Sequence, residues 1–472
     1  MARVPLALAF RSNQTRHGYE GAARLINCYA EALDKDAKGP VCIYPTEGLD
    51  PWIAPAEGGI KCFLPTDSYL YGVSGVTVFA IDTSFAVHNL GTLDLEASCY
   101  MARNRRSPTT QVGLVSQDTY WVIEGTTMTE VTDPDLPPPS CIDVKDGYFV
   151  LPTTFGRYFV TGEDDGTTVD ALDFGKAQRS PGDVLRVIAT ETDVMLLKSD
   201  GIEWVQNQPT STASFPFVPV AAIDLGLRNA EAAVRLNRDV FWIANDGTVR
   251  RMNGYGGDII STGPVERDIG ALSSEEAVNA AAWTVPDAGK TFVSFRSSLW
   301  CWVYDIEGGA WHERKSHGSD TWRVGPVTEW GGYVLAGDAD TGMIYRMSRL
   351  TYSEGGYPIK MVIQTPPVDA TPDPLFVNCL DVMVIPGQGV PTVARADITD
   401  PDLLMDYSDD GGRTWSTQRS ASMGKSGESL KRVRFTRLGM IRRNGRTFRF
   451  QLPASTARGV TAAVIDVEKG SS

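Results

Sequence analysis

The chain has 472 residues, of which 42% are hydrophobic, with a formal net charge of −14 and seven cysteines. It is longer than one average domain, and its longest apolar runs fall short of the roughly 20 residues that a membrane span needs. The cysteines are odd in number, dispersed and without a C-x-x-C pair, which argues against a disulfide framework or a zinc site and favours a reducing compartment.

The first segment, residues 1–59, precedes any repeat. It begins with MARVPLALAFR, in which a short apolar patch ends at Arg11. Because this patch is short for the apolar region of a secretory leader, we expect no signal peptide. The remainder of the segment predicts an extended arm that contains strands.

Seven predicted hairpins follow, each made of two β-branched or aromatic runs joined by a turn. Between the start of the first hairpin at Ser68 and that of the seventh at Gly332 lie 264 residues, a mean spacing of about 44. Four turns carry glycine: Ser74-Gly75, Asp200-Gly201, Asp246-Gly247 and Thr341-Gly342. This period is typical of propeller blades. We predict a β-propeller over residues 60–356, with seven blades favoured over six; a run of β-sandwiches is the alternative, which the regular spacing disfavours.

The pattern changes after the repeats. Residues 357–376 include TPPVDATPDPLF, and they are expected to form a proline-rich linker. Residues 377–472 return to alternating strands, which predict a C-terminal β-sandwich. The expected fold class is therefore all-β, a propeller followed by a sandwich.

The segment YSDDGGRTWS lies in the predicted sandwich. Ser408, Asp410, Gly412 and Trp415 match S-x-D-x-G-x-x-W, the Asp box of sialidases. Asp410 is expected to accept hydrogen bonds from the following amides, while Gly411 and Gly412 take positive φ and Trp415 begins the returning strand. A retaining glycosidase needs two carboxylates about 5 Å apart or an equivalent nucleophile, which one hairpin cannot supply. We therefore interpret the motif as a structural turn.

Two other sequence motifs, one for zinc binding and one for phosphate binding, each lack one required residue. HERKSH has Ser316 where H-E-x-x-H needs histidine, and SMGKSG has Arg419 where a P-loop needs glycine. Six tryptophans on repeat strands are expected in the core and not in a ligand cage: Trp204, Trp242, Trp300, Trp302, Trp322 and Trp330. We predict no catalytic, cofactor or metal site and no enzymatic activity, although a glycan site built by distant loops stays open.

Charge is distributed unevenly. Residues 401–472 hold 13 Lys/Arg against 7 Asp/Glu, or +6, so the first 400 residues sum to −20. The stretch KRVRFTRLGMIRRNGRTFR contains no acid. Such a block can bind nucleic acid or dock onto an acidic protein, and the acidic body disfavours general DNA affinity. The predicted docking residues are Lys431, Arg432, Arg434, Arg437, Arg442, Arg443 and Arg446.

The order of several segments resembles one family. INCYAEALDKDAKGPVCIYPTEGL precedes the repeats, VDALDFGKAQRSPGDVLRVIATETDVMLLKSDGIEWVQN lies in mid-chain, LGLRNAEAAVRLNRDVFWIANDGTVRRMNGYGG follows, and YSDDGGRTWS lies near the end. Together these segments are similar to the packaged-DNA-stabilising tail hub proteins of short-tailed bacteriophages, also called nozzle or head-completion proteins. The resemblance spans nearly the whole chain.

The resemblance implies a structural virion protein of the tail, assembled in the host bacterial cytoplasm. It implies a hexameric ring that closes the DNA exit channel, stabilises packaged DNA and passes it at ejection. The implied partners are the portal adaptor ring, tail fibre, spike or needle proteins, and genomic double-stranded DNA without sequence-specific contact; no membrane insertion is expected. The alternatives are a sialidase-like propeller enzyme and a monomeric propeller that binds proteins or glycans.

Overall fold

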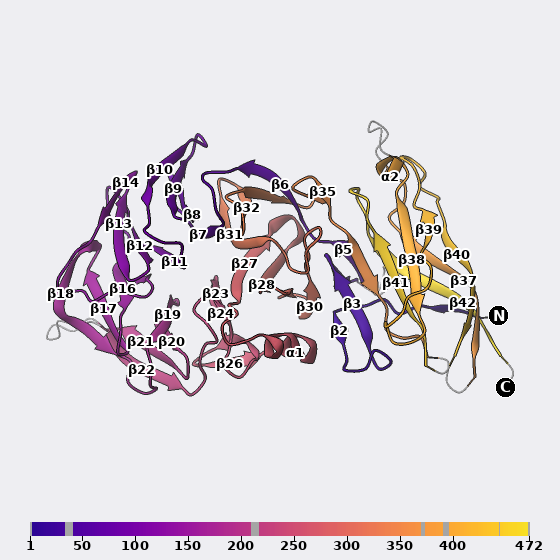
Figure 1. The fold of residues 1–472 in the computed structure, drawn as a ribbon, viewed down its shortest axis with the longest axis horizontal. Coiled ribbons are helices and arrows are strands. Elements are labelled where there is room, and N and C mark those ends of the chain that lie inside the picture. Colours follow the sequence, from indigo (N-terminus) through magenta and orange to yellow (C-terminus); the bar gives the residue numbers. More distant parts are fainter. Residues whose placement is uncertain are drawn as a thin grey trace.

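The computed structural model describes residues 2–33, 41–208, 217–369, 373–389, 396–442 and 444–470. Its ribbon has a ring of small sheets on one side and a two-sheet body on the other, with several indigo strands of the N-terminal segment between them and the N-terminus itself at the far side of the two-sheet body (Figure 1). Among the described residues the helices are α1 (Gly263–Ala271), α2 (Ala396–Thr399) and a single 3-10 turn (Pro286–Ala288). The all-β class is confirmed.

The ring begins with three four-stranded antiparallel sheets. The first contains β7 (Ile60–Pro65), β8 (Tyr69–Ser74), β9 (Thr77–Asp82) and β10 (Val87–Thr92). The second contains β11 (Cys99–Arg103), β12 (Gln111–Ser116), β13 (Thr119–Glu124) and β14 (Thr127–Glu130). The third contains β15 (Asp143–Lys145), β16 (Tyr148–Pro152), β17 (Arg157–Gly162) and β18 (Asp165–Lys176).

Three further sheets continue the ring. The fourth contains β19 (Val184–Ala189), β20 (Asp193–Lys198), β21 (Ile202–Asn207) and β22 (Phe217–Ile223). The fifth contains β23 (Ala233–Leu236), β24 (Asp239–Ile243), β25 (Val249–Asn253) and β26 (Gly256–Ile259). The sixth group contains β27 (Asn279–Val285), β28 (Lys290–Arg296), β29 (Cys301–Asp305) and β30 (Ala310–Glu313), and it is continuous with a sandwich sheet because Glu313 of β30 pairs with Ile26. Strands such as β12 and β20 are buried along their whole length because another sheet covers each face.

The seventh sheet combines two distant parts of the chain. β31 (Val324–Trp330), β32 (Tyr333–Asp338) and β33 (Ile344–Ser348) follow in sequence, and the fourth strand is β6 (Gly48–Ile53), which pairs antiparallel with β33. The first and seventh sheets share a core that joins Ile60 to Leu335 and Ile344. The described strands thus form five separate four-stranded sheets, while β27 to β30 belong to a ten-stranded sheet and β31 to β33 with β6 belong to a six-stranded one.

The C-terminal body is a sandwich of two sheets. One contains β4 (Cys28–Ala32), β5 (Val41–Pro45), β42 (Val460–Lys469), β37 (Leu375–Val384) and β40 (Val433–Ile441), with β1 (Ala2–Pro5) paired to β42. The other contains β3 (Ala22–Ile26), β36 (Met361–Gln364), β41 (Thr447–Leu452), β38 (Asp402–Ser408) and β39 (Arg419–Ser422), with β2 (Asn13–Gln14) paired to β3. Leu25, Leu380, Phe448 and Ile465 belong to one buried core between them.

Two segments differ from the sequence-based expectation. Residues 1–59 supply strands to both sandwich sheets and to the seventh propeller sheet, so they do not form a separate arm. Residues 357–376, expected as a linker, contain β36 in the middle of a sandwich sheet, and the short β34 (Ser353–Glu354) and β35 (Tyr357–Pro358) extend the β6 sheet. Both differences arise because β6 and β36 pair with strands that lie far away in the sequence, about which local patterns carry no information.

Five of the six tryptophans expected in the core are buried: Trp204, Trp242, Trp302, Trp322 and Trp330. Trp300 is half-buried and precedes β29, with its indole Nε1 donating to the Asp268 carbonyl at 3.2 Å. Its side chain therefore packs partly against α1, and the expectation for this residue was wrong.

The Asp-box turn and the arginine surface of the sandwich

The Asp box is a closed turn at the end of β38. The Gly412 amide donates to the Ser408 hydroxyl oxygen at 2.8 Å, and that hydroxyl donates to Asp410 Oδ1 at 2.7 Å. The Thr414 amide reaches the two carboxylate oxygens of Asp410 at 2.8 and 3.0 Å. The Thr414 hydroxyl and then its amide lower the pKa of Asp410 to about 2. Gly411 (φ 71°) and Gly412 (φ 90°) provide the left-handed backbone of the turn.

Trp415 lies after this turn but not in a strand, since β39 begins only at Arg419. The Arg449 guanidinium stands 3.8 Å from the Trp415 ring centroid. Nε and Nη2 of Arg449 donate to the two oxygens of Asp406, at 2.9 and 2.6 Å. The motif is thereby attached to β41, in agreement with its interpretation as a structural turn.

The neighbouring carboxylates of Asp409 and Asp410 have different partners. Asp409 accepts from Nε and Nη2 of Arg446 at 2.5 and 2.7 Å, whereas Asp410 is bound within its own turn. A catalytic carboxylate needs an oxygen that can meet substrate or a proton. This pair is instead engaged in folding contacts.

The predicted docking arginines divide into several environments. Arg432 and Arg434 both direct their guanidinium forks at Asp381 on β37, with the shortest distances at 2.5 and 2.6 Å. Lys431 lies 3.7 Å from Glu428. These pairs remove part of the positive charge that the sequence suggested.

Arg446 is 3% exposed, and its guanidinium stacks 3.8 Å from the Tyr407 ring centroid. Its side chain is a buried part of the sandwich and does not lie on the surface predicted for docking. Arg443 lies outside the described residues. The side chains of Arg437 and Arg442 are exposed, and within the described ranges neither has a hydrogen bond or ion pair.

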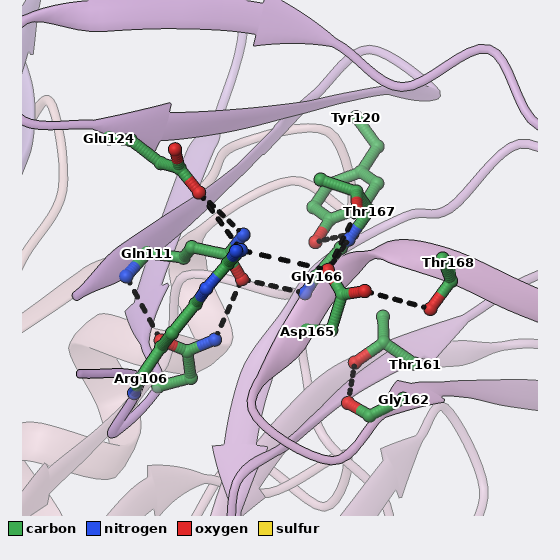
Figure 2. A network of polar contacts seen from close by, with 11 residues as sticks. Arg106, Gln111, Tyr120, Glu124, Thr161, Gly162, Asp165, Gly166, Thr167 and Thr168 are labelled. Atoms are coloured by element: carbon green, nitrogen blue, oxygen red, sulfur yellow. Dashed lines mark hydrogen bonds and ion pairs between the residues drawn. The ribbon is translucent and has the colours of Figure 1, made fainter. Parts of the chain in front are cut away.

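A second polar cluster joins two propeller sheets (Figure 2). Gln111 on β12 is fully buried, and its Oε1 accepts from the Gly166 amide of β18 at 2.8 Å. Its Nε2 donates to Glu124 Oε1 at 2.8 Å, and Arg106 Nη1 reaches the same oxygen at 3.0 Å. Tyr120 donates its hydroxyl to the Gly166 carbonyl at 2.9 Å. The cluster fastens the third sheet to the second, and sequence reasoning missed it because glutamine on a strand carries no local signal.

In the part of the chain that the structure describes, no group of three or more His, Cys, Asp or Glu side chains is placed to hold a metal ion. No helix among those residues is long and apolar enough to cross a membrane. The seven cysteines are free thiols, and burial raises the pKa of six of them: Cys28, Cys42, Cys62, Cys99, Cys141 and Cys301.

Solved structures similar to this chain are distant. The WD40 β-propeller domain of Doa1 has 11% identity and a TM-score of 0.41, covering 64% of this chain and 95% of that one. The Cps50 (Swd1) β-propeller domain of Myceliophteria thermophila has 10% identity and a TM-score of 0.42, covering 64% and 99%. No curated protein sequence matches significantly.

Family models give a specific result. The model described as the bacteriophage P22 Gp10 β-propeller matches residues 53–352, and that of the Gp10 β-sandwich matches residues 360–468. The propeller model alone spans more than half of the chain. The two family models match in the same order as the propeller and the sandwich of the structure. The chain therefore belongs to the bacteriophage P22 Gp10 family, the tail hub or stabilising structural proteins of short-tailed phages.

Proposed function

We propose that this chain is one subunit of a ring-shaped hub that continues the DNA exit channel below the portal adaptor, closes it and holds the packaged genome until ejection. The observation that carries this proposal is the consecutive match of both Gp10 domains along one chain. The ring is expected to be a hexamer that is assembled in the host bacterial cytoplasm and resides in the virion tail. Tail fibre, spike or needle proteins are the expected partners on the distal side.

Electrostatics support such a role. The first 400 residues sum to −20, and acidic surfaces repel DNA phosphates, so a channel lined by them lets DNA pass without adhering. The side chains of Arg437 and Arg442 are exposed on the sandwich and have no hydrogen bond or ion pair among the described residues. Rim charges of this kind increase the rate of docking onto an acidic protein. We assign the exposed part of the basic block to a protein interface and not to DNA.

We also propose that the chain has no catalytic activity. The bound carboxylates of Asp409 and Asp410 support this view, as do the two structural-protein families. Purified protein should release no product from sialosides or host capsule polymers. Turnover that Asp410→Asn abolishes without unfolding would contradict the proposal and favour the enzyme alternative.

The proposal is tested by assembly. Native mass spectrometry should give a multiple of the 51.3 kDa chain mass, and the protein should copurify with virions. Arg437→Glu with Arg442→Glu should leave the fold intact but slow docking onto DNA-filled heads, most strongly at low salt. The same charge change at the exposed propeller residues Arg105 and Arg179 is the matched control. A protein that stays monomeric and is absent from virions would contradict the proposal.

A further inference from the structure

A polar cavity of about 270 Å³ lies where the N-terminal strands meet the sandwich. We call it the seam pocket and define it by its lining: Gln14, Thr15, Gly18, Gly21, Ala22, Arg24, Gln364, Gly411, Gly412, Trp415 and Arg449. These residues come from the β2–β3 hairpin, from β36 and β41, and from the Asp-box turn. Figure 1 shows β2 and β3 between the propeller and the sandwich.

Two arginines line this pocket, Arg24 on β3 and Arg449 on β41, and both strands belong to the same sandwich sheet. Nε and Nη2 of Arg24 donate to Glu313 of β30 at 2.7 and 2.6 Å, and the same atoms of Arg449 donate to Asp406. The remaining guanidinium nitrogen of each arginine, Nη1, has no hydrogen-bond partner among the described residues. The side chains of Arg24 and Arg449 are 32% and 26% exposed, and both residues line the pocket.

The rest of the lining adds neutral donors and open backbone. The amides of Gln14 and Gln364 have no side-chain hydrogen bond among the described residues, although both line the cavity. Gly18 touches the Asp-box turn so closely that a Cβ there would lie 1.9 Å from the Gly411 carbonyl oxygen. The wall is thus fixed by backbone contact between the N-terminal segment and the sandwich.

The charge of the lining selects the kind of ligand. Two arginines line the seam pocket, and each is paired on its other edge with a carboxylate that does not line it, Glu313 or Asp406. A cavity of about 420 Å³ beside β13 and β14 has the opposite character, since Glu124, Glu130 and Asp133 line it without a base. Guanidinium groups held in place match the oxygens of phosphate and carboxylate.

We propose that the seam pocket binds a small oxyanion, a phosphate or carboxylate group on a molecule no larger than a sugar acid. Its oxygens would accept from the Nη1 groups of Arg24 and Arg449 and from the Gln364 amide. Arg24 lies on the sandwich strand β3 and pairs with Glu313 of β30, so the bound anion would reinforce the side of the sandwich that adjoins the propeller. Such a ligand stabilises the folded chain in proportion to its concentration over its Kd.

The test uses the full chain at constant ionic strength. Thermal unfolding and calorimetric titration are followed with inorganic phosphate, with glucuronate, with uncharged glucose and with chloride. Phosphate, glucuronate or both should raise Tm in a saturable way, and the stronger of the two identifies the source of the oxyanion. Glucose and chloride should leave Tm unchanged.

Variants then locate the binding. Gln364→Ala keeps both arginine–carboxylate pairs, and it should weaken Kd by about tenfold because a donor to a charged group is lost. Arg449→Lys keeps the charge but loses the fork, and it should weaken Kd further. Gln418→Ala, an exposed amide of the same sandwich, is the control and should bind as wild type. Saturable stabilisation by neither oxyanion, equal stabilisation by glucose, or unchanged affinity in Gln364→Ala would each overturn the assignment.

Discussion

His312 shows how a single side chain can link stability to pH. It is buried, with its ring centroid 6.1 Å from that of Tyr29 and 5.6 Å from that of Phe292. Burial, followed by the charges of Arg314 and Lys290, lowers its pKa to about 3. The unfolded chain, with an ordinary pKa near 6.5, binds the proton first as pH falls.

The stability that His312 contributes is therefore full above about pH 6.5 and is lost progressively down to about pH 3. His312→Phe should reduce the pH dependence of the unfolding free energy in this window by up to about 1.4 kcal/mol per pH unit. Urea unfolding at pH 4, 5, 6 and 7 measures it. His17→Phe, at an exposed position, is the control. An unchanged slope in His312→Phe would show that other groups cause the dependence.

Asp410 has a similar dependence at lower pH. Hydrogen bonds from Thr414 and Ser408 lower the pKa of its carboxyl to about 2. The stabilisation is present above its ordinary value near 4 and is lost as pH falls through 2. Asp410→Asn should lower Tm at pH 7, with the difference from wild type shrinking as pH approaches 2. Asp94→Asn, an exposed carboxyl, should show no such convergence.

At the scale of elements, the segment before β6 is held by a buried ion pair. Arg314 Nη1 donates to Glu47 Oε2 at 3.1 Å, and Nη2 donates to the Glu47 carbonyl at 2.7 Å. The guanidinium also stacks 3.8 Å from the Trp322 ring centroid. Burial lowers the pKa of Arg314, so removal of its anion is costly.

Glu47→Gln should cost about 3–5 kcal/mol of unfolding free energy, because it leaves a buried cation without its anion. Asp50→Asn changes an exposed carboxyl on β6 itself and should cost much less. Denaturant unfolding of both variants gives the comparison. A cost of less than about 1 kcal/mol for Glu47→Gln would mean that Arg314 is compensated by other groups.

Trp242 and Trp300 allow the stability contribution of a buried tryptophan to be compared with that of a half-buried one. Trp242 on β24 is fully buried, and its truncation to alanine should cost about 3–5 kcal/mol. Trp300 is only half-buried, so Trp300→Ala should cost clearly less. Equal losses in denaturant unfolding would show that the contact of Trp300 with α1 matters as much as a core position.

At the scale of the whole molecule, one chain segment closes the ring and enters the sandwich. Residues 46–356 retain Glu47 and β6, whereas residues 60–356 lack the outer strand of the seventh sheet. The longer fragment should unfold cooperatively, and the shorter one should aggregate because β33 becomes an uncovered edge. Circular dichroism and light scattering distinguish the two. Equal solubility and cooperativity would show that β6 is dispensable for closure.

The sequence alone determined the features that are encoded within a few residues. Hairpins with glycine turns predicted the propeller sheets, and the spacing of Ser408, Asp410 and Gly412 predicted a structural turn, since both form hydrogen bonds between near neighbours. Only the tertiary structure decided that β6 and β36 are sheet strands, that Arg446 is buried and that Arg432 and Arg434 share Asp381. Those outcomes depend on which distant strands pack together, and the local pattern of polar and apolar residues does not contain that information.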